Sequence, residues 1–89
     1  MIFTVVLTAT ARANLARIDR VTAGRIVAAI QRYAATGHGH VIPLKGRPGE
    51  WRMRMGDWRV IFTRHEGEKP DDRKLIVSAI RPRGGAYQD

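Results

Sequence analysis

The sequence predicts an α+β fold in which a helical hairpin covers one face of a single, mostly antiparallel sheet. Three observations predict it: an apolar, β-branched segment near the N-terminus, two segments with helical periodicity after it, and three strand-like segments in the second half. The expected order is therefore β-α-α-β-β-β. With 89 residues and 44% hydrophobic content, the chain suits one domain, residues 1–89, around one core.

The first half contains the N-terminal strand and the hairpin. Residues 2–7 are apolar and β-branched, as in a short buried strand. Thr8 or Thr10 can cap a helix that runs to about residue 19, because apolar side chains then recur at helical spacing. The same spacing predicts a second helix over residues 22–36.

Gly37 is expected to end the second helix and to open a loop that runs to Gly49. This segment is rich in glycine and proline and shows no periodicity, which is typical of irregular structure. The three histidines, His38, His40 and His65, are expected in solvated loops. No neighbouring cysteine or closely spaced acid gives them a zinc-ligand pattern, and we expect no metal site.

The first strand of the second half shows strict alternation over residues 50–55. Its apolar side chains should face the core, with Trp51 and Met53 more suited to packing than to stacking on nucleic-acid bases. Glu50, Arg52 and Arg54 should then lie on the opposite face. If the helices cover only one face, that opposite face is an open cationic surface, although it could also be no more than a solvated polar face.

Two further strands are expected after this one. The pair Gly56-Asp57 suits a turn into a strand over residues 58–64, and the apolar run at residues 74–80 predicts a central, buried strand. Residues 81–89 contain Pro82 and two glycines and are not expected to continue a regular strand.

The charge balance points to a polyanionic partner. Sixteen Lys and Arg against eight Asp and Glu give a formal net charge of +8 and a pI of about 11.3, and most of the cations are arginine. Such a field attracts nucleic acid, although a merely solvated basic surface or an acidic protein partner also fits.

Other features of the composition limit the chemistry and the location. The chain has no cysteine, which excludes disulfides, thiolate metal sites and a cysteine nucleophile. Neither a signal peptide nor a membrane-spanning segment is recognisable, so we expect a cytoplasmic protein without membrane contact.

Several short motifs together resemble the RelE/ParE superfamily of toxins from type II toxin-antitoxin systems. A basic loop, an aromatic-basic-x-basic strand, an aromatic-Arg strand and a C-terminal Arg-x-x-x-x-x-Tyr follow one another in the order typical of that family, over nearly the whole chain. The matching segments are Leu44-Lys45-Gly46, Trp51-Arg52-Met53-Arg54, Gly56-Asp57-Trp58-Arg59 and Arg81 to Tyr87. The RelE-like branch is favoured by the joint presence of Arg52, Arg54, Arg81 and Tyr87.

The resemblance implies a toxin that cleaves mRNA on the ribosome, without metal or cofactor, and that a cognate antitoxin silences, in a heterotetramer or larger assembly. In such enzymes the ribose 2′-hydroxyl attacks the adjacent phosphate, and the protein must move protons and offset negative charge. The matching catalytic positions are Arg52, Arg54, Arg59, Arg81 and Tyr87, with Lys45, Arg47 and Arg83 as RNA-binding residues.

One departure from the family affects the mechanism. Well-known RNA-cleaving members carry lysine where this chain has Arg52 and Arg54, and arginine does not release its proton in proteins. We therefore hypothesise that Tyr87 takes the 2′-hydroxyl proton, with nearby guanidinium groups stabilising its phenolate. Arg52, Arg54 and Arg59 would hold the phosphate, and Arg81 would stabilise the leaving group or position Tyr87.

Two other functions remain open on the sequence. A ParE-like inhibitor of DNA gyrase would share the Gly56-Asp57-Trp58-Arg59 turn, and the arginines at the two lysine positions favour it. A catalytically silent module that binds antitoxin or nucleic acid would show no growth arrest on expression.

Overall fold

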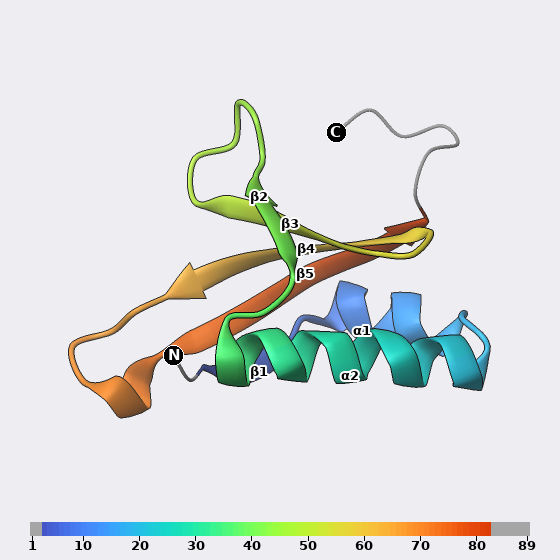
Figure 1. Ribbon diagram of the computed structural model, residues 1–89, viewed down its shortest axis with the longest axis horizontal. Coiled ribbons are helices and arrows are strands. Elements are labelled where there is room, and N and C mark those ends of the chain that lie inside the picture. Colours follow the sequence, from blue (N-terminus) through green and yellow to red (C-terminus); the bar gives the residue numbers. More distant parts are fainter. Residues whose placement is uncertain (1–2, 83–89) are drawn as a thin grey trace.

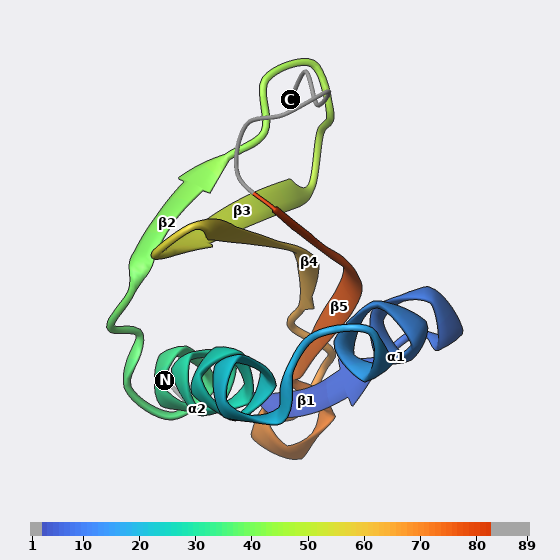
Figure 2. The same cartoon turned by 90° about the vertical axis from the view of Figure 1, so that its right-hand side faces the viewer.

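The computed structural model describes residues 3–82 and has the expected α+β architecture. Its strands form a single sheet in the order β1-β5-β4-β3-β2, in which β1 runs parallel to β5 and all other neighbours are antiparallel. Both helices lie on the same side of this sheet (Figure 1, Figure 2). The elements are β1 (Thr4–Leu7), α1 (Ala9–Ala16), α2 (Arg20–Thr36), β2 (His40–Pro43), β3 (Glu50–Met55), β4 (Trp58–His65), a 3-10 turn (Pro70–Asp72) and β5 (Lys74–Pro82).

The two helices begin and end at residues suited to those positions. The Thr8 hydroxyl accepts the Ala11 N–H at 3.1 Å and so caps α1, while Asp19 accepts the Thr22 N–H at 3.0 Å and caps α2. That hydrogen bond from Thr22 lowers the pKa of Asp19. Gly37 closes α2 with a φ of 79°, a conformation that glycine adopts without strain. Within the described residues, no helix has the length and apolarity needed to cross a membrane.

One core lies between the helices and the inner face of the sheet. Phe62 is fully buried at its centre, with its ring 5.4 Å from that of Tyr33 on α2. Arg64 also points to this inner face, where its guanidinium lies 4.0 Å from the Trp51 ring centroid and donates to the Tyr33 hydroxyl at 3.2 Å. The remaining buried members of the core are Phe3, Ala11, Ile26, Ile30, Ala34, Met53, Val60, Leu75, Val77 and Ile80. Trp58 packs against this core, as expected for the aromatic residues of the strands.

Strand β2 lies inside the segment that was predicted to be a loop. Residues 40–43 pair with β3, so that His40 lies opposite Arg54. The prediction of a solvated loop is therefore wrong for His40 and for His65, which is the last residue of β4. His38 lies before β2, outside the strands, and all three histidines are exposed. Val41 and Ile42 are β-branched, but they stand between glycine and proline residues and show no periodicity, so only the pairing with β3 reveals the strand.

Strand β5 extends through Pro82, two residues beyond its predicted end. The Ile80 N–H donates to the Asn14 side-chain oxygen at 2.9 Å, away from β4. Backbone N–H groups two residues apart point to the same side of a strand, so the nitrogen of Pro82 also faces away from β4. No ladder hydrogen bond is lost there, and the proline is tolerated.

Candidate nucleic-acid interface

The functional residues predicted on strands gather on the outer face of the sheet, which the helices leave uncovered. Opposite residues of antiparallel strands point to the same face, and alternate residues of one strand share a face. Because Met53, Val60 and Phe62 point into the core, Arg52, Arg54 and Arg59 belong to the outer face. The expected division of β3 into an apolar and a cationic face is thus confirmed.

Four residues from four strands form a transverse row on this face. His40 on β2 lies opposite Arg54 on β3, Arg54 lies opposite Arg59 on β4, and Arg59 lies opposite Arg81 on β5. Adjacent strands are about 4.8 Å apart, so neighbouring guanidinium groups can reach one phosphodiester. We call His40, Arg54, Arg59 and Arg81 the cationic row.

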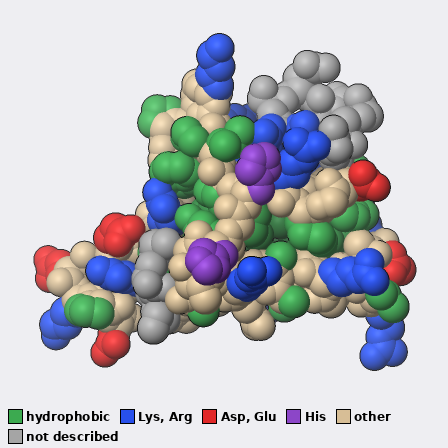
Figure 3. Space-filling model, viewed as in Figure 1, with side chains coloured by type: hydrophobic (Ala, Val, Ile, Leu, Met, Phe, Trp, Pro, Cys, Tyr) green, Lys and Arg blue, Asp and Glu red, His purple; other side chains and the backbone are tan. Residues whose placement is uncertain are grey.

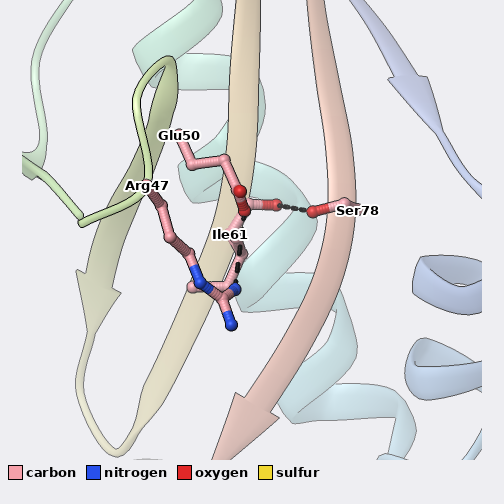
Figure 4. A network of polar contacts seen from close by, with 4 residues as sticks. All are labelled: Arg47, Glu50, Ile61 and Ser78. Atoms are coloured by element: carbon pink, nitrogen blue, oxygen red, sulfur yellow. Dashed lines mark hydrogen bonds and ion pairs between the residues drawn. The ribbon is translucent and has the colours of Figure 1, made fainter. Parts of the chain in front are cut away.

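Arg81 reaches this row because of a bulge in β5. The register shifts between Ile61 and Phe62, which pair with Ala79 and Val77, so that Ser78 is the extra residue. With strict alternation Arg81 would share the inner face with Val77, whereas the bulge turns it to the outer face. The bulge is held on both sides: the Ser78 hydroxyl donates to the Ile61 carbonyl at 3.2 Å (Figure 4), and the Ser78 carbonyl accepts from the Thr8 hydroxyl at 3.1 Å.

Arg52 lies beside the cationic row, in the next row along the sheet. There it lies opposite Ile42 on β2 and Ile61 on β4, and Ile61 in turn lies opposite Ala79. The apolar row next to the cations is mostly buried, because Ile61 and Ala79 are 5% and 6% exposed, whereas Ile42 on the edge strand is 39% exposed.

The RNA-binding residues predicted in the 37–49 segment lie at the far end of β3. Lys45 and Arg47 are exposed in the loop between β2 and β3 (Figure 1), and Arg47 folds back to an ion pair with Glu50 at 3.7 Å (Figure 4). Glu50 precedes Arg54 by four residues, which corresponds to roughly 13 Å along a strand. These two cations are thus not brought together with the cationic row. Tyr87 and Arg83 lie outside the described residues.

A groove opens between α2 and β3, on the helix side of the sheet. It has a volume of about 540 Å³, and its walls are Ala28, Ala29, Met53 and Met55. In the space-filling view, hydrophobic side chains appear between α2 and the strands above it, flanked by Lys, Arg and His side chains (Figure 3). The groove's polar rim consists of Arg25, Arg32 and His38, with Gly39 beside them. Arg54 also borders the groove, although alternation along β3 places its side chain on the outer face.

Sequence reasoning missed one residue of the site, His40. His40 precedes the Trp51-Arg52-Met53-Arg54 strand in the chain, but the sequence did not show that residues 40–43 form a strand paired with it. Over residues 3–82 no three His, Cys, Asp or Glu side chains gather as metal ligands would.

Comparison with known proteins identifies both sequence and fold relatives. The sequence profile of the family described as ParE toxin of type II toxin-antitoxin system, parDE, matches residues 5–87. No curated protein sequence is significantly similar to the chain. The fold is similar to that in the RelBE2 toxin-antitoxin complex of Mycobacterium tuberculosis, with a TM-score of 0.73, 22% identity, and coverage of 93% of this chain and 100% of that one.

Two archaeal complexes are also similar in fold. The RelE-RelB complex of Pyrococcus horikoshii OT3 gives a TM-score of 0.75 at 22% identity, with 97% of this chain and 100% of that chain covered. The RelB-RelE complex of Methanococcus jannaschii gives a TM-score of 0.65 at 15% identity, with 86% and 88% covered. At these identities the likeness concerns the fold.

Proposed function

The chain belongs to the ParE toxin family of type II toxin-antitoxin systems, within the RelE/ParE superfamily, and its fold is similar to that in RelE-RelB complexes; we propose that it is a toxin that cleaves mRNA on the ribosome. The cationic row is the observation that carries this proposal. Arg54, Arg59 and Arg81 lie side by side in register, so their guanidinium groups are placed to bind one phosphodiester together. The proposed site of action is the cytoplasm, where mRNA is translated.

The chemistry follows from where negative charge develops. In-line attack of the 2′-hydroxyl puts charge on the equatorial phosphate oxygens, and guanidinium groups fixed on a sheet can stabilise it without rearrangement. Arginine suits this role because its planar fork binds phosphate through two hydrogen bonds. In this proposal Arg52, Arg54 and Arg59 hold the phosphate, Arg81 lies nearest the leaving group, and no metal ion takes part.

Tyr87 is proposed to exchange a proton with the RNA. Replacing it with phenylalanine removes only the hydroxyl, and we expect cleavage to fall by about 100-fold or more, the usual contribution of a proton-transfer group. The measurement is a single-turnover cleavage assay with mRNA positioned on 70S ribosomes. Cleavage by Tyr87→Phe at the wild-type rate would remove Tyr87 from the mechanism.

Expression in bacteria tests the function as a whole. After induction, incorporation of radiolabelled methionine should stop before that of thymidine, and primer extension should show new 5′ ends within translated codons. Loss of thymidine incorporation first, with intact mRNA, would refute the ribonuclease.

A gyrase inhibitor is the second candidate, because the matching family profile is that of ParE toxins. It would act by binding and not by RNA cleavage, so the cationic row would contact DNA or the enzyme. Purified protein that blocks gyrase supercoiling and leaves ribosome-bound mRNA intact would establish it. Protein that does neither and causes no growth arrest would be a silent binding module.

We further propose that a cognate antitoxin binds in the groove between α2 and β3. The solved structures with the same fold are toxin-antitoxin complexes. The groove combines an apolar floor with arginines at both ends of the α2 wall, Arg25 and Arg32, which are seven residues apart and so lie on one helix face. An amphipathic segment with a central apolar residue and flanking carboxylates would match it.

A bulky side chain in the groove should weaken the binding of the antitoxin. Ala28 is exposed, so Ala28→Phe should fold normally, and we expect its affinity for the purified antitoxin to fall at least about tenfold, or about 1.4 kcal/mol. Ala13→Phe makes the same change at an exposed position of α1, which does not line the groove, and serves as the control. Equal affinities of the two variants by calorimetry would place the antitoxin elsewhere.

A further inference from the structure

None of the arginines of the cationic row can act as a general base. Cleavage by the 2′-hydroxyl requires a group that accepts its proton, and arginine keeps its own proton at all working pH values. Among the strand residues of the outer face that the structure describes, an imidazole or a carboxylate is carried by His40, His65 and Glu50. Asp57 lies off the strands, in the turn between β3 and β4.

His40 is the only one of these three placed in the cationic row. It lies opposite Arg54, with about 5 Å expected between Cβ atoms of such a pair. Glu50 is four residues from Arg54, and its carboxylate pairs with Arg47. His65 is six residues beyond Arg59, roughly 20 Å along β4.

The environment of His40 is cationic and open to solvent. Arg54 faces it directly from β3, Arg52 lies diagonally across on the same strand, and Arg59 follows on β4; His38 precedes it in the chain. The exposed imidazole can therefore meet a substrate that the neighbouring guanidinium groups hold by its phosphate. An imidazole, unlike a guanidinium, can accept a proton from a hydroxyl group.

We propose that His40 is the general base of the cleavage, an inference that rests on the proposed ribonuclease function. The neutral imidazole takes the proton of the 2′-hydroxyl, the 2′-oxygen forms a bond to phosphorus, and the bond from phosphorus to the 5′-oxygen breaks. The 5′-oxygen receives a proton from Tyr87, the residue proposed above to exchange a proton with the RNA. The products are a 2′,3′-cyclic phosphate and a 5′-hydroxyl, and solvent returns the proton from His40 to Tyr87. This assigns Tyr87 the donor role in place of the acceptor role that the sequence suggested.

Paired substrates separate the two proton-transfer roles. One mRNA carries the ordinary 5′-oxygen at the scissile bond, and the other carries a 5′-sulfur, which leaves without protonation. Both are positioned on 70S ribosomes and cleaved under single-turnover conditions by wild type, His40→Gln, Tyr87→Phe and the control His65→Gln, an exposed histidine on the same face. Rates are measured across pH 5 to 9, a range of about two units either side of neutrality.

We expect His40→Gln to be slower by about 100-fold on both substrates and to lose the fall in rate on the acid side of the pH profile. Tyr87→Phe should be slow on the oxygen substrate and close to wild type on the sulfur substrate. His65→Gln should match wild type on both. Added imidazole should restore part of the activity of His40→Ala, because it replaces the missing base in solution.

If the wild-type protein cleaves mRNA, three outcomes would overturn the role of His40 and leave the ribonuclease function standing. These are a His40→Gln rate close to wild type, a His40→Gln defect that the 5′-sulfur removes, and an equal defect in His65→Gln. A wild-type protein that cleaves neither substrate would instead overturn the ribonuclease function, and the role of His40 with it. Thermal unfolding of each variant verifies that the fold is retained.

Discussion

Replacing Arg59 with glutamine is expected to lower mRNA cleavage by at least about 100-fold. Arg59 lies in the middle of the cationic row, between Arg54 and Arg81, so its loss removes a donor from the position where phosphate charge develops. Glutamine keeps a polar side chain on the strand but no charge. We expect both weaker RNA binding and slower chemistry, measured as the concentration dependence and the maximum rate of single-turnover cleavage on ribosomes.

The control must remove one charge elsewhere. Arg12 is exposed on α1, on the helix side of the sheet, and Arg12→Gln lowers the net charge by the same amount. If general attraction to the ribosome explains the effect, the two variants should be equally impaired, and both should lose their difference from wild type at high salt. If the row binds the scissile phosphate, only Arg59→Gln should lose its maximum rate.

Replacing Phe62 with alanine is expected to destabilise the domain by about 3–5 kcal/mol. The ring is fully buried and packs against Tyr33, so truncation leaves a cavity between α2 and the sheet. Small domains have about 5–15 kcal/mol of stability, so the variant should lose a large share of it and unfold at a clearly lower urea concentration. Urea unfolding followed by the fluorescence of Trp51 and Trp58 measures the change, since both pack against the same core.

Phe62→Leu is the matched control, because leucine keeps most of the apolar volume. It should cost less than the alanine variant, and the two together give the share of the loss that comes from the cavity. A decrease of less than about 1 kcal/mol in Phe62→Ala would mean that the helix layer does not depend on this contact.

Local patterns in the sequence predicted most of the fold. The alternation of apolar and polar residues assigned both faces of β3 correctly, and the caps at Thr8 and Gly37 marked the ends of the helices. These features depend on near neighbours in the chain, such as the hydrogen bond between Thr8 and Ala11. Strand β2 and the extension of β5 depend on contacts between distant parts of the chain, and neither was predicted.

The candidate site divides in the same way. Composition and alternation by themselves determined a strongly basic protein with Arg52 and Arg54 on the face opposite the core. Only the tertiary structure decided that His40 and Arg81 join Arg54 and Arg59 in one row. The reason is physical: His40 depends on which strand pairs with β3, and Arg81 depends on a bulge whose hydrogen bonds come from β4 and from the start of α1. Neither the pairing of β2 with β3 nor the bulge in β5 produces a periodic sequence pattern around His40 or Arg81.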